Sequence, residues 1–434
     1  MASFNVSKKI TYLTLAGAAL VPGGAFAQVV TEPIPVLPND YPIERQGVAD
    51  RYRPDYESEG LAVGPMQVRP QLGVGGAYTS NVYGAASGEL DDFYLAVNPS
   101  LTVQKTNGGD NAITARFSGA LRRYAEETRA NETAFGGDID STFALGNNSF
   151  LQAGGSAHRY YERQDSGSFP TGALAPIRYS DLNAYLRARA GGSRVRLTAA
   201  VDIDRTKFSD AKYSDGQTID QSARDRRVLR GSTRGEVSFT GSTFGFVELR
   251  YSDINYLRNF LDNGDANRDG KQYEVLSGVR LDSGKLRGQV AGGYVRRTFK
   301  APIYNDFGGF ALNGEVVYYA SGLTTFTLNG YRNITESGDP NISAQFTTGV
   351  TAKVDHELLR YIILSGQIGY DRNTYRGYNR KDEIASVRGG IRYLMTRRFE
   401  VNAQAAYVKR TSTGAQFGPE FNRFEFGVNL VGKL

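Results

Sequence analysis

Hydrophobic and polar residues alternate with a period of two along the chain from Val68 onward, in segments of about ten to fourteen residues. In the segment 194–204, hydrophobic residues occupy the odd positions, while arginine, threonine and aspartate occupy the even positions except Ala200. The segments 361–371 and 399–410 repeat this pattern. Because successive side chains of a β-strand point to opposite faces, such segments can meet hydrocarbon and water at once. The pattern predicts membrane-spanning strands.

The connections between these segments alternate in length. Short connections rich in glycine and asparagine lie at 107–109, 146–148, 191–193, 241–243, 283–285, 321–322 and 396–398. Longer polar connections lie at 164–176, 210–220, 257–270 and 412–420. Glycine and asparagine supply the positive φ angles of tight hairpins, so the short connections are predicted to be hairpin turns. In outer-membrane barrels the short turns face the periplasm and the longer loops face outside.

These features together predict an all-β fold, a single transmembrane antiparallel up-and-down β-barrel of about 18 strands. A barrel of that width leaves an aqueous channel unless something fills it. A soluble array of β-sandwiches would also alternate, but the loop-length pattern and the need to pair every backbone group in lipid favour the barrel. Aromatic residues at strand ends are predicted to form interfacial girdles. They are Tyr78, Tyr94, Tyr124, Tyr160, Tyr161, Tyr251, Tyr294, Tyr318, Tyr370, Tyr393 and Tyr407.

The first 66 residues have a different pattern. Lys8 and Lys9 precede an apolar run over 10–21 that is too short to span a bilayer, and Ala25 and Ala27 provide small residues for cleavage. We therefore expect a cleaved signal peptide over 1–27 and a location in the outer membrane of a Gram-negative cell. The proline-rich segment 28–66 shows neither the period of a helix nor that of a strand. We therefore expect it to be an extended periplasmic arm, with the barrel over 67–434.

Composition narrows the function classes. No stretch after the signal peptide approaches the 18 apolar residues of a membrane helix, so a helical membrane protein is excluded. The chain has no cysteine, hence no disulfide framework. A net charge of +6 is only mildly basic and gives no reason to expect nucleic acid as a partner.

Short motifs add a resemblance. The chain contains an Arg53-Pro54-Asp55-Tyr56 lead-in, a Tyr78-Thr79-Ser80-Asn81-Val82 box and an Asn98-Pro99-Ser100-Leu101 element. Over this region it resembles the outer-membrane family called putative β-barrel porin 2, although Asp is commoner than Ser at position 80. The resemblance implies a porin-like barrel without an enzymatic role. It also implies an association with exopolysaccharide, capsule or holdfast secretion, and so with a periplasmic polysaccharide-export complex.

The water face of the predicted strands is rich in charge. Basic residues fall on it at Arg116, Arg122, Arg187, Arg189, Arg194, Arg196, Arg230, Arg234, Arg250, Arg280, Arg287, Arg297, Arg388 and Arg392. Acidic residues fall on it at Asp138, Asp140, Asp181, Asp202, Asp204, Glu236, Glu248, Glu274, Glu315, Glu400 and Glu425. Fixed positive charge in a narrow pore favours anions. The alternative is a ladder of opposite charges that only braces the wall. The basic residues between 187 and 234 are expected to crowd the periplasmic mouth.

Other chemistry has weak support. Asp265, Asn267 and Asp269 match half of a calcium loop, but Leu276 stands where the bidentate glutamate is needed, so an ordinary extracellular loop is the simpler interpretation. The two histidines, His158 and His356, lack metal-ligand spacing, and no orienting partner for a catalytic triad is visible. We expect no enzymatic activity, no cofactor and no metal.

The leading hypothesis from sequence is a channel or exporter in contact with outer-membrane lipid. Its aqueous pore would pass an anionic polysaccharide or small hydrophilic solutes. The alternative hypothesis is a structural or adhesive barrel with a closed lumen, whose long loops bind a surface partner.

Overall fold

The computed structural model describes residues 47–106, 111–146, 148–164, 166, 168–170, 173, 175–213, 217–339, 342–416 and 418–434. The first half of the wall consists of β2 (Met66–Thr79), β3 (Asp92–Thr106), β4 (Ala112–Tyr124), β5 (Glu132–Gly146), β6 (Ser149–Glu162), β7 (Ile177–Gly191), β8 (Val195–Phe208), β11 (Arg226–Thr240) and β12 (Thr243–Tyr256). The second half consists of β13 (Gly270–Ser283), β14 (Leu286–Phe299), β15 (Phe307–Ser321), β16 (Thr324–Thr335), β17 (Gln345–Leu359), β18 (Ile362–Tyr375), β19 (Lys381–Leu394), β20 (Phe399–Thr413) and β21 (Phe421–Lys433). Minor elements are β1 (Leu61–Val63), β9 (Ala211–Lys212), β10 (Thr218–Ile219) and the 3-10 turns η1 (Thr128–Ala130) and η2 (Ser222–Arg224).

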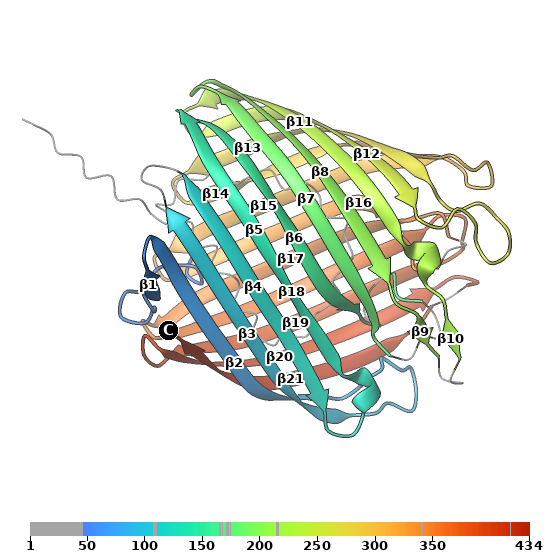
Figure 1. Cartoon of the computed structure of the whole chain (residues 1–434), viewed down its shortest axis with the longest axis horizontal. Helices are drawn as coiled ribbons and strands as arrows, with labels where there is room; N and C mark the ends of the chain where they lie inside the picture. Colours follow the sequence, from blue (N-terminus) through green and yellow to red (C-terminus); the bar gives the residue numbers. More distant parts are fainter. Residues whose placement is uncertain are drawn as a thin grey trace, which may run out of the picture.

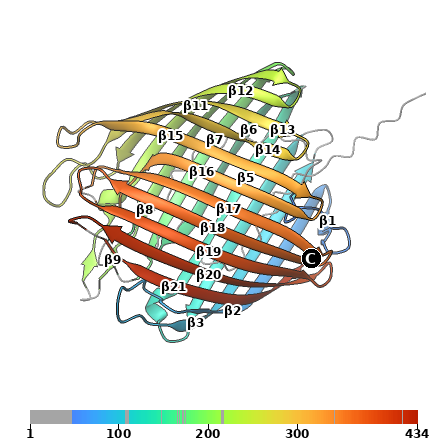
Figure 2. The ribbon, with the colours of Figure 1, turned by 180° about the vertical axis from the view of Figure 1, so that it is seen from behind.

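The long strands form one closed ring. Each pairs antiparallel with the next along the chain, and β21 pairs with β2, for example Tyr78 with Phe426, which closes the sheet. Figures 1 and 2 show the two walls of the barrel, with strands tilted strongly to its axis. The predicted fold class and strand number are confirmed: the chain is an up-and-down barrel of 18 long strands. No helix in the described part of the chain is long and apolar enough to cross a membrane.

The connections follow the predicted alternation. Short turns lie at the end of the barrel that carries β1 and the carboxyl end of β21, and the longer loops, with β9, β10 and both 3-10 turns, lie at the other (Figure 1). Gly284 and Asn148 have φ angles of +50° and +59° in two of the short turns, as hairpins of this length require. We call the two ends the periplasmic and the extracellular mouth.

The expected signal peptide at 1–27 lies outside the described residues, as does the arm up to residue 46. The described part of the expected arm differs from a free extended segment. It turns at residues 48–50, pairs β1 onto the start of β2, and enters the first barrel strand at Met66.

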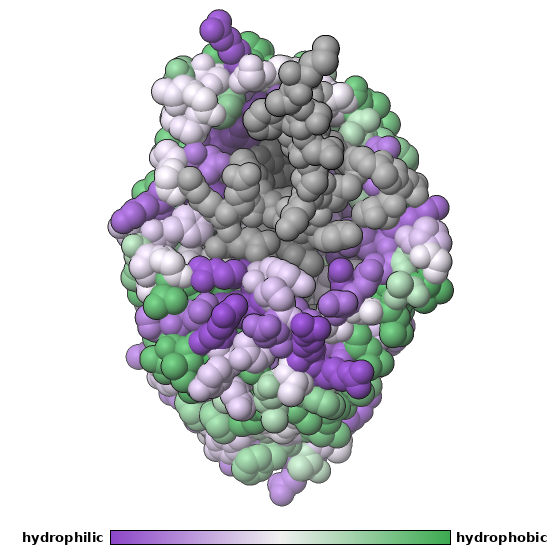
Figure 3. Space-filling view, turned by 90° about the vertical axis from the view of Figure 1, so that its left-hand side faces the viewer, coloured by the Kyte–Doolittle hydropathy of each residue, from purple (hydrophilic) through white to green (hydrophobic). Residues whose placement is uncertain are grey.

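Exposure alternates along the strands and separates the two faces of the wall. On β8, the odd-numbered residues from Val195 to Ile203 are exposed, while the even-numbered residues between them are more buried. Because charged side chains on a lipid face are costly, the exposed apolar face is the outer one. Seen from the periplasmic mouth, hydrophobic residues lie around the margin and hydrophilic residues nearer the centre (Figure 3).

Three predicted girdle residues lie instead on the inner face. Tyr94 and Tyr124 are buried there with their rings 5.0 Å apart, and Tyr160 stacks on His158 inside the barrel. The girdle prediction was wrong for these residues because a tyrosine near a strand end can belong to either face of the strand. Tyr318, Tyr370, Tyr393 and Tyr407 are exposed on the outer face.

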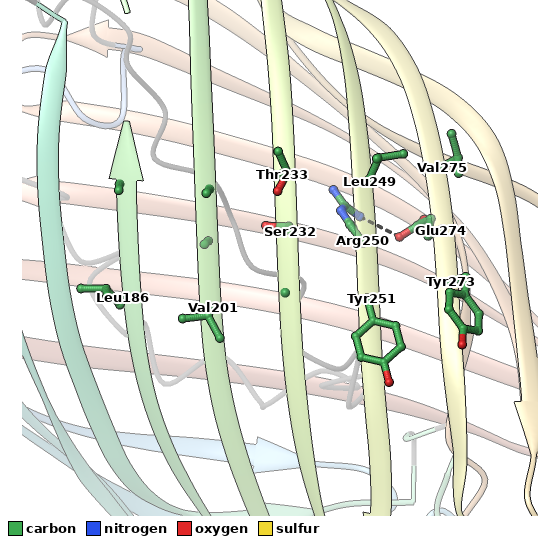
Figure 4. Close-up of a pocket in the computed structure, with 14 residues that line it drawn as sticks. Leu186, Val201, Ser232, Thr233, Leu249, Arg250, Tyr251, Tyr273, Glu274 and Val275 are labelled. Carbon is green, nitrogen blue, oxygen red and sulfur yellow. Dashed lines mark hydrogen bonds and ion pairs between the residues drawn. The ribbon is translucent and has the colours of Figure 1, made fainter. Parts of the chain in front are cut away.

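A shallow groove of about 650 Å³ crosses the wall from β7 to β13, and its lining is mostly apolar. Figure 4 shows Tyr251 and Tyr273 side by side on β12 and β13, with the ion pair of Arg250 and Glu274 beside them. The centres of the two tyrosine rings lie 5.4 Å apart. Since residues 250 and 251 point to opposite faces, the tyrosines and Leu249 belong to the lipid face. We therefore assign this groove to lipid chains and look for the solute path inside the barrel.

Candidate functional site: the charged lumen and its two mouths

Opposite charges are paired within strands and between adjacent strands on one side of the inner wall. Arg230 on β11 lies 2.6 Å from Asp202 on β8, and Arg250 on β12 lies 2.6 Å from Glu248 and 3.1 Å from Glu274. Cross-strand neighbours on one face are close enough for such pairs. In this part of the wall the charges form a ladder of ion pairs that braces the barrel. This is the alternative to an anion path that the sequence analysis left open. Further pairs are Arg230 with Asp204, and Arg234 with Glu236 and Glu248.

Four arginines gather on one part of the inner wall near the periplasmic mouth. We define the arginine cluster as Arg187, Arg189, Arg196 and Arg280, which lie near the periplasmic ends of β7, β8 and β13. The guanidinium groups of Arg196 and Arg280 both lie 4.5 Å from the ring centre of Phe244 on β12. Arg280 is on the neighbouring strand β13, and Arg196 is on β8, beyond β11. Such contacts stabilise a cation without neutralising it.

Further contacts hold the cluster in position. Arg189 donates to the hydroxyl of Thr198 at 3.1 Å and lies over Phe150, and Arg187 lies over Tyr185. Glu236 lies 3.9 Å from Arg280 and is also contacted by Arg234. Asp140 and Asp202 lie close enough to Arg187 to interact with its charge. Within the described residues, the Nε atoms of Arg187 and Arg196 are buried without a hydrogen-bond partner. The cluster is therefore a set of oriented cations, held by aromatic rings and by a few carboxylates.

The remaining predicted basic residues are distributed around the ring. Arg116 and Arg122 pair with Asp140 and Glu132 on the neighbouring strand β5. Arg287, Arg297, Arg388 and Arg392 lie on the inner faces of β14 and β19. Arg194 differs from its prediction: it lies exposed in the turn between β7 and β8, because β8 begins one residue later.

The most deeply buried arginines lie at the extracellular mouth. Arg268, Arg297, Arg410 and Arg423 are among the largest fully buried side chains. Arginines therefore lie at both mouths, and not at the periplasmic mouth alone as the sequence led us to expect. The sequence reasoning missed Arg163, Arg224 and Arg268, since they lie in loops, where no alternation reveals which way a side chain points.

Three extracellular loops fold inward and meet. The loop between β6 and β7 is held by Arg410 of β20, which donates to the backbone oxygens of Gln164 at 2.7 Å and Ser166 at 2.9 Å. Arg224, between β8 and β11, pairs with Glu162 at 2.8 Å. These side chains are almost completely buried, so the loops pack against each other and the wall rather than extend into solvent.

Arg268 fixes the third loop, between β16 and β17. Its Nη1 atom donates to the backbone oxygens of Ser337, Asp339 and Ile342, at 3.1, 3.2 and 3.1 Å. Glu336 at the start of this loop contacts Arg297 and accepts from the hydroxyl of Tyr256. Burial alone would raise the pKa of Glu336, but the neighbouring arginines outweigh burial and lower this pKa to about 2. Glu336 is therefore ionised at neutral pH and anchors the loop.

The arm occupies part of the periplasmic mouth. Val48 is fully buried against Ile363 and Leu394, and its backbone NH donates to Thr325 at 3.1 Å. Arg53 lies 2.7 Å from Glu357. Arg392 of β19 donates to the backbone oxygen of Ala49 at 3.1 Å. One predicted pore residue therefore serves to hold the arm against the inner wall.

The calcium-loop residues have other partners. The amide of Asn267 donates to the backbone oxygens of Ala223 and Arg258, and Asp269 accepts from the backbone NH of Tyr256. Among the residues that the structure describes, no group of three or more His, Cys, Asp or Glu side chains could hold a metal ion. These contacts explain the residues as parts of a folded loop.

His158 has a partner that the sequence did not reveal. Its Nε2 atom lies 3.0 Å from Asp138 on the neighbouring strand, where cross-strand pairing also places Ser156 opposite Asp138. The ring of His158 stacks on Tyr160, which continues a row of rings through Tyr179. The fold therefore places the carboxylate of Asp138 beside His158, and the ring of Tyr160 covers one face of the imidazole.

A family model described as putative beta-barrel porin 2 matches residues 53–433, starting at the Arg-Pro lead-in. No curated protein matches the chain. Among solved structures it is similar to the outer membrane protein opdK from Pseudomonas aeruginosa, with a TM-score of 0.44, 12% identity, and coverage of 85% of this chain and 99% of that one. It is also similar to OccAB4 from Acinetobacter baumannii, with a TM-score of 0.45, 10% identity, and coverage of 85% of this chain and 98% of that one. A structure titled bacterial polysaccharide outer membrane secretin matches with a TM-score of 0.36, 11% identity, and coverage of 84% of this chain and 98% of that one.

Proposed function

Since this chain belongs to the putative β-barrel porin 2 family, we propose that it is a porin-like outer-membrane channel for hydrophilic anions, without catalytic activity or a cofactor. The arginine cluster carries this proposal. Its four guanidinium groups lie on the inner wall near the periplasmic mouth, where aromatic rings hold them in position. Charge fixed on a wall of low dielectric constant raises the local concentration of the opposite ion.

The cargo divides into two classes. Small anionic solutes need only a narrow passage, whereas an anionic polysaccharide needs a continuous path past both mouths. The inward-folded loops and the docked arm favour small solutes, because both narrow the path. Export of an anionic polysaccharide, with a periplasmic export complex as partner, is the second cargo hypothesis. It requires the loops to part.

The same inward-folded loops also support a second candidate function, that of a structural or adhesive barrel with a closed lumen. The two functions differ in conductance. Purified protein in a planar bilayer with a salt gradient should show conductance steps and a reversal potential that indicates anion preference. The absence of any step across salt conditions would favour the closed barrel, and cation preference would contradict the role of the arginine cluster.

A double variant tests the cluster itself. Arg196→Gln with Arg280→Gln should lower the anion-to-cation permeability ratio by roughly thirtyfold, since each of the two charges at close range is worth about 1 kcal/mol in high dielectric. Arg296→Gln is the matched control. Arg296 of β14 lies exposed on the outer face of the barrel, away from the lumen, and pairs with Asp306. An unchanged ratio in the double variant, with unchanged conductance, would assign these arginines to bracing alone.

A further inference from the structure

Two loops from almost opposite sides of the ring touch at one point. We define the loop seam as the contact between Ser168, in the loop after β6, and Gly338, in the loop after β16. A Cβ atom on Gly338 would lie 1.5 Å from the backbone oxygen of Ser168 and 3.4 Å from the guanidinium carbon of Arg224. Only glycine allows two backbones to approach so closely. The seam therefore depends on the absence of a side chain at position 338.

The seam spans the lumen, because β6 and β16 are nearly opposite in the order of the ring. Each side is anchored to a different part of the wall. Arg410 on β20 holds the loop after β6, and Arg268 after β12 holds the loop after β16. Glu162 joins the first loop to Arg224 beneath the seam. Charge-assisted hydrogen bonds of this kind are the stronger ones, so the seam is a fixed partition and not a pair of free loops.

We infer that the loop seam sets the upper size of solute that the channel passes at its extracellular mouth. This inference rests on the proposed channel function and adds its substrate class: small hydrophilic solutes, which pass beside the seam, and not a polymer chain. A polymer would have to separate Ser168 from Gly338 and break buried ion pairs at every passage. Buried charged groups that lose a partner are costly, so such a passage is unfavourable.

The test is Gly338→Ala, which introduces the overlapping Cβ and should force the two loops apart. Gly330→Ala is the matched control, since a Cβ on Gly330 of β16 meets nothing within 4 Å. Liposome swelling with uncharged sugars of increasing size gives the size limit, and single-channel recording gives the conductance. We expect the size limit and the conductance to rise in Gly338→Ala and to stay at the wild-type values in Gly330→Ala.

A second variant keeps the inference testable if Gly338→Ala does not fold, as judged by heat-dependent migration on gels. Glu162→Gln removes the carboxylate charge from Arg224 while retaining a similar shape, and should also raise the size limit. Its control is Asp306→Asn, which breaks an exposed ion pair in a different extracellular loop.

The outcomes separate the two proposals. If wild type conducts and neither Gly338→Ala nor Glu162→Gln changes the size limit, the inference about the seam is wrong and the channel function stands. If wild type passes large oligosaccharides freely, the seam is not a size barrier. If the wild-type protein shows no conductance and Gly338→Ala conducts, the seam closes the barrel entirely. The wild-type protein is then not an open channel. Silence of all variants, correctly folded, overturns both.

Discussion

At the scale of single residues, the face of a strand residue could be predicted from the sequence, and its partners could not. Alternation alone places Arg230 and Asp202 on one face, but their 2.6 Å contact depends on the register between β8 and β11. Tyr94 was assigned to the wrong face, since tyrosine suits either an interface or a packed interior. For Arg268 the sequence offers no signal, because its role depends on carbonyl groups about seventy residues away in the chain.

Arg268 gives a prediction at this scale. Arg268→Met should release the loop over 336–344, because each hydrogen bond from a charged group is worth about 1.5–3 kcal/mol. Hydrogen exchange of the loop amides should rise by at least about tenfold, which corresponds to 1.4 kcal/mol. Arg258→Met, in the same loop as Arg268 but with a partly exposed side chain, should leave the exchange unchanged. Protection equal to wild type in Arg268→Met would mean that the loop is held by other contacts.

The pH dependence of this loop follows from Glu336. Its pKa is lowered in the folded loop, so its contribution is present in full above the ordinary value of 4.5 and is lost as pH falls toward about 2. Arg268 is one of three arginines that lower this pKa, together with Arg297 and Arg226. In Arg268→Met the loss should therefore be smaller and should be complete at a higher pH than in wild type. Loop exchange measured over an acid titration, corrected for the intrinsic rate, checks the direction.

At the scale of elements, strands and turns were predictable because their physical rules are local. The period of two marks each strand, and the short glycine-containing connections mark the hairpins. The loops and the arm were not predictable in the same way. Their positions depend on contacts such as Val48 with Leu394 and Arg410 with Gln164, which join parts of the chain far apart in sequence. A proline-rich composition indicated only that the arm lacks regular structure.

The arm gives a prediction at this scale. Val48→Ala removes two buried carbons, worth about 0.8 kcal/mol each, so docking should weaken by roughly tenfold. Trypsin cleavage after Arg51 should accelerate accordingly, because docking protects this segment. Val63→Ala is the control, since Val63 is exposed in β1. If the rates of cleavage are equal in Val48→Ala and wild type, the arm is not held by its contact with Ile363 and Leu394.

At the scale of the whole molecule, the sequence predicted the strand number, the barrel type and the family, and the structure and the family match confirm them. These properties were accessible because each strand must be nearly the same length to cross one membrane and each must pair on both edges. What the sequence could not show is how far the lumen is filled. Side chains, loops and arm share that space, and none of them is constrained by a repeating period.

The pairing of β2 with β21, which we call the closing pair because it closes the ring, gives a prediction at this scale. A Cβ on Gly75 of β2 would lie 2.2 Å from the backbone oxygen of Val428 on β21, whereas a Cβ on Gly76 would meet nothing within 4 Å. Gly75→Ala should therefore strain the β2–β21 pair and lower the temperature at which the folded band disappears on gels. Gly76→Ala, one residue away, should not. Equal melting of the two variants would show that the closing pair adapts to the extra carbon.

The pairing of β2 with β21 also determines the order in which the protein can fold. All other neighbours in the ring follow one another along the chain, so they can form as successive hairpins whose loops are far shorter than the loop between β2 and β21. The closing pair joins Ser80 to Phe424, 344 residues apart, and has the largest entropic cost of contact formation. Until that contact forms, β2 and β21 are open edges that can pair with other chains. Closure is thus the slow step, and the stage at which a nascent barrel is most prone to aggregate.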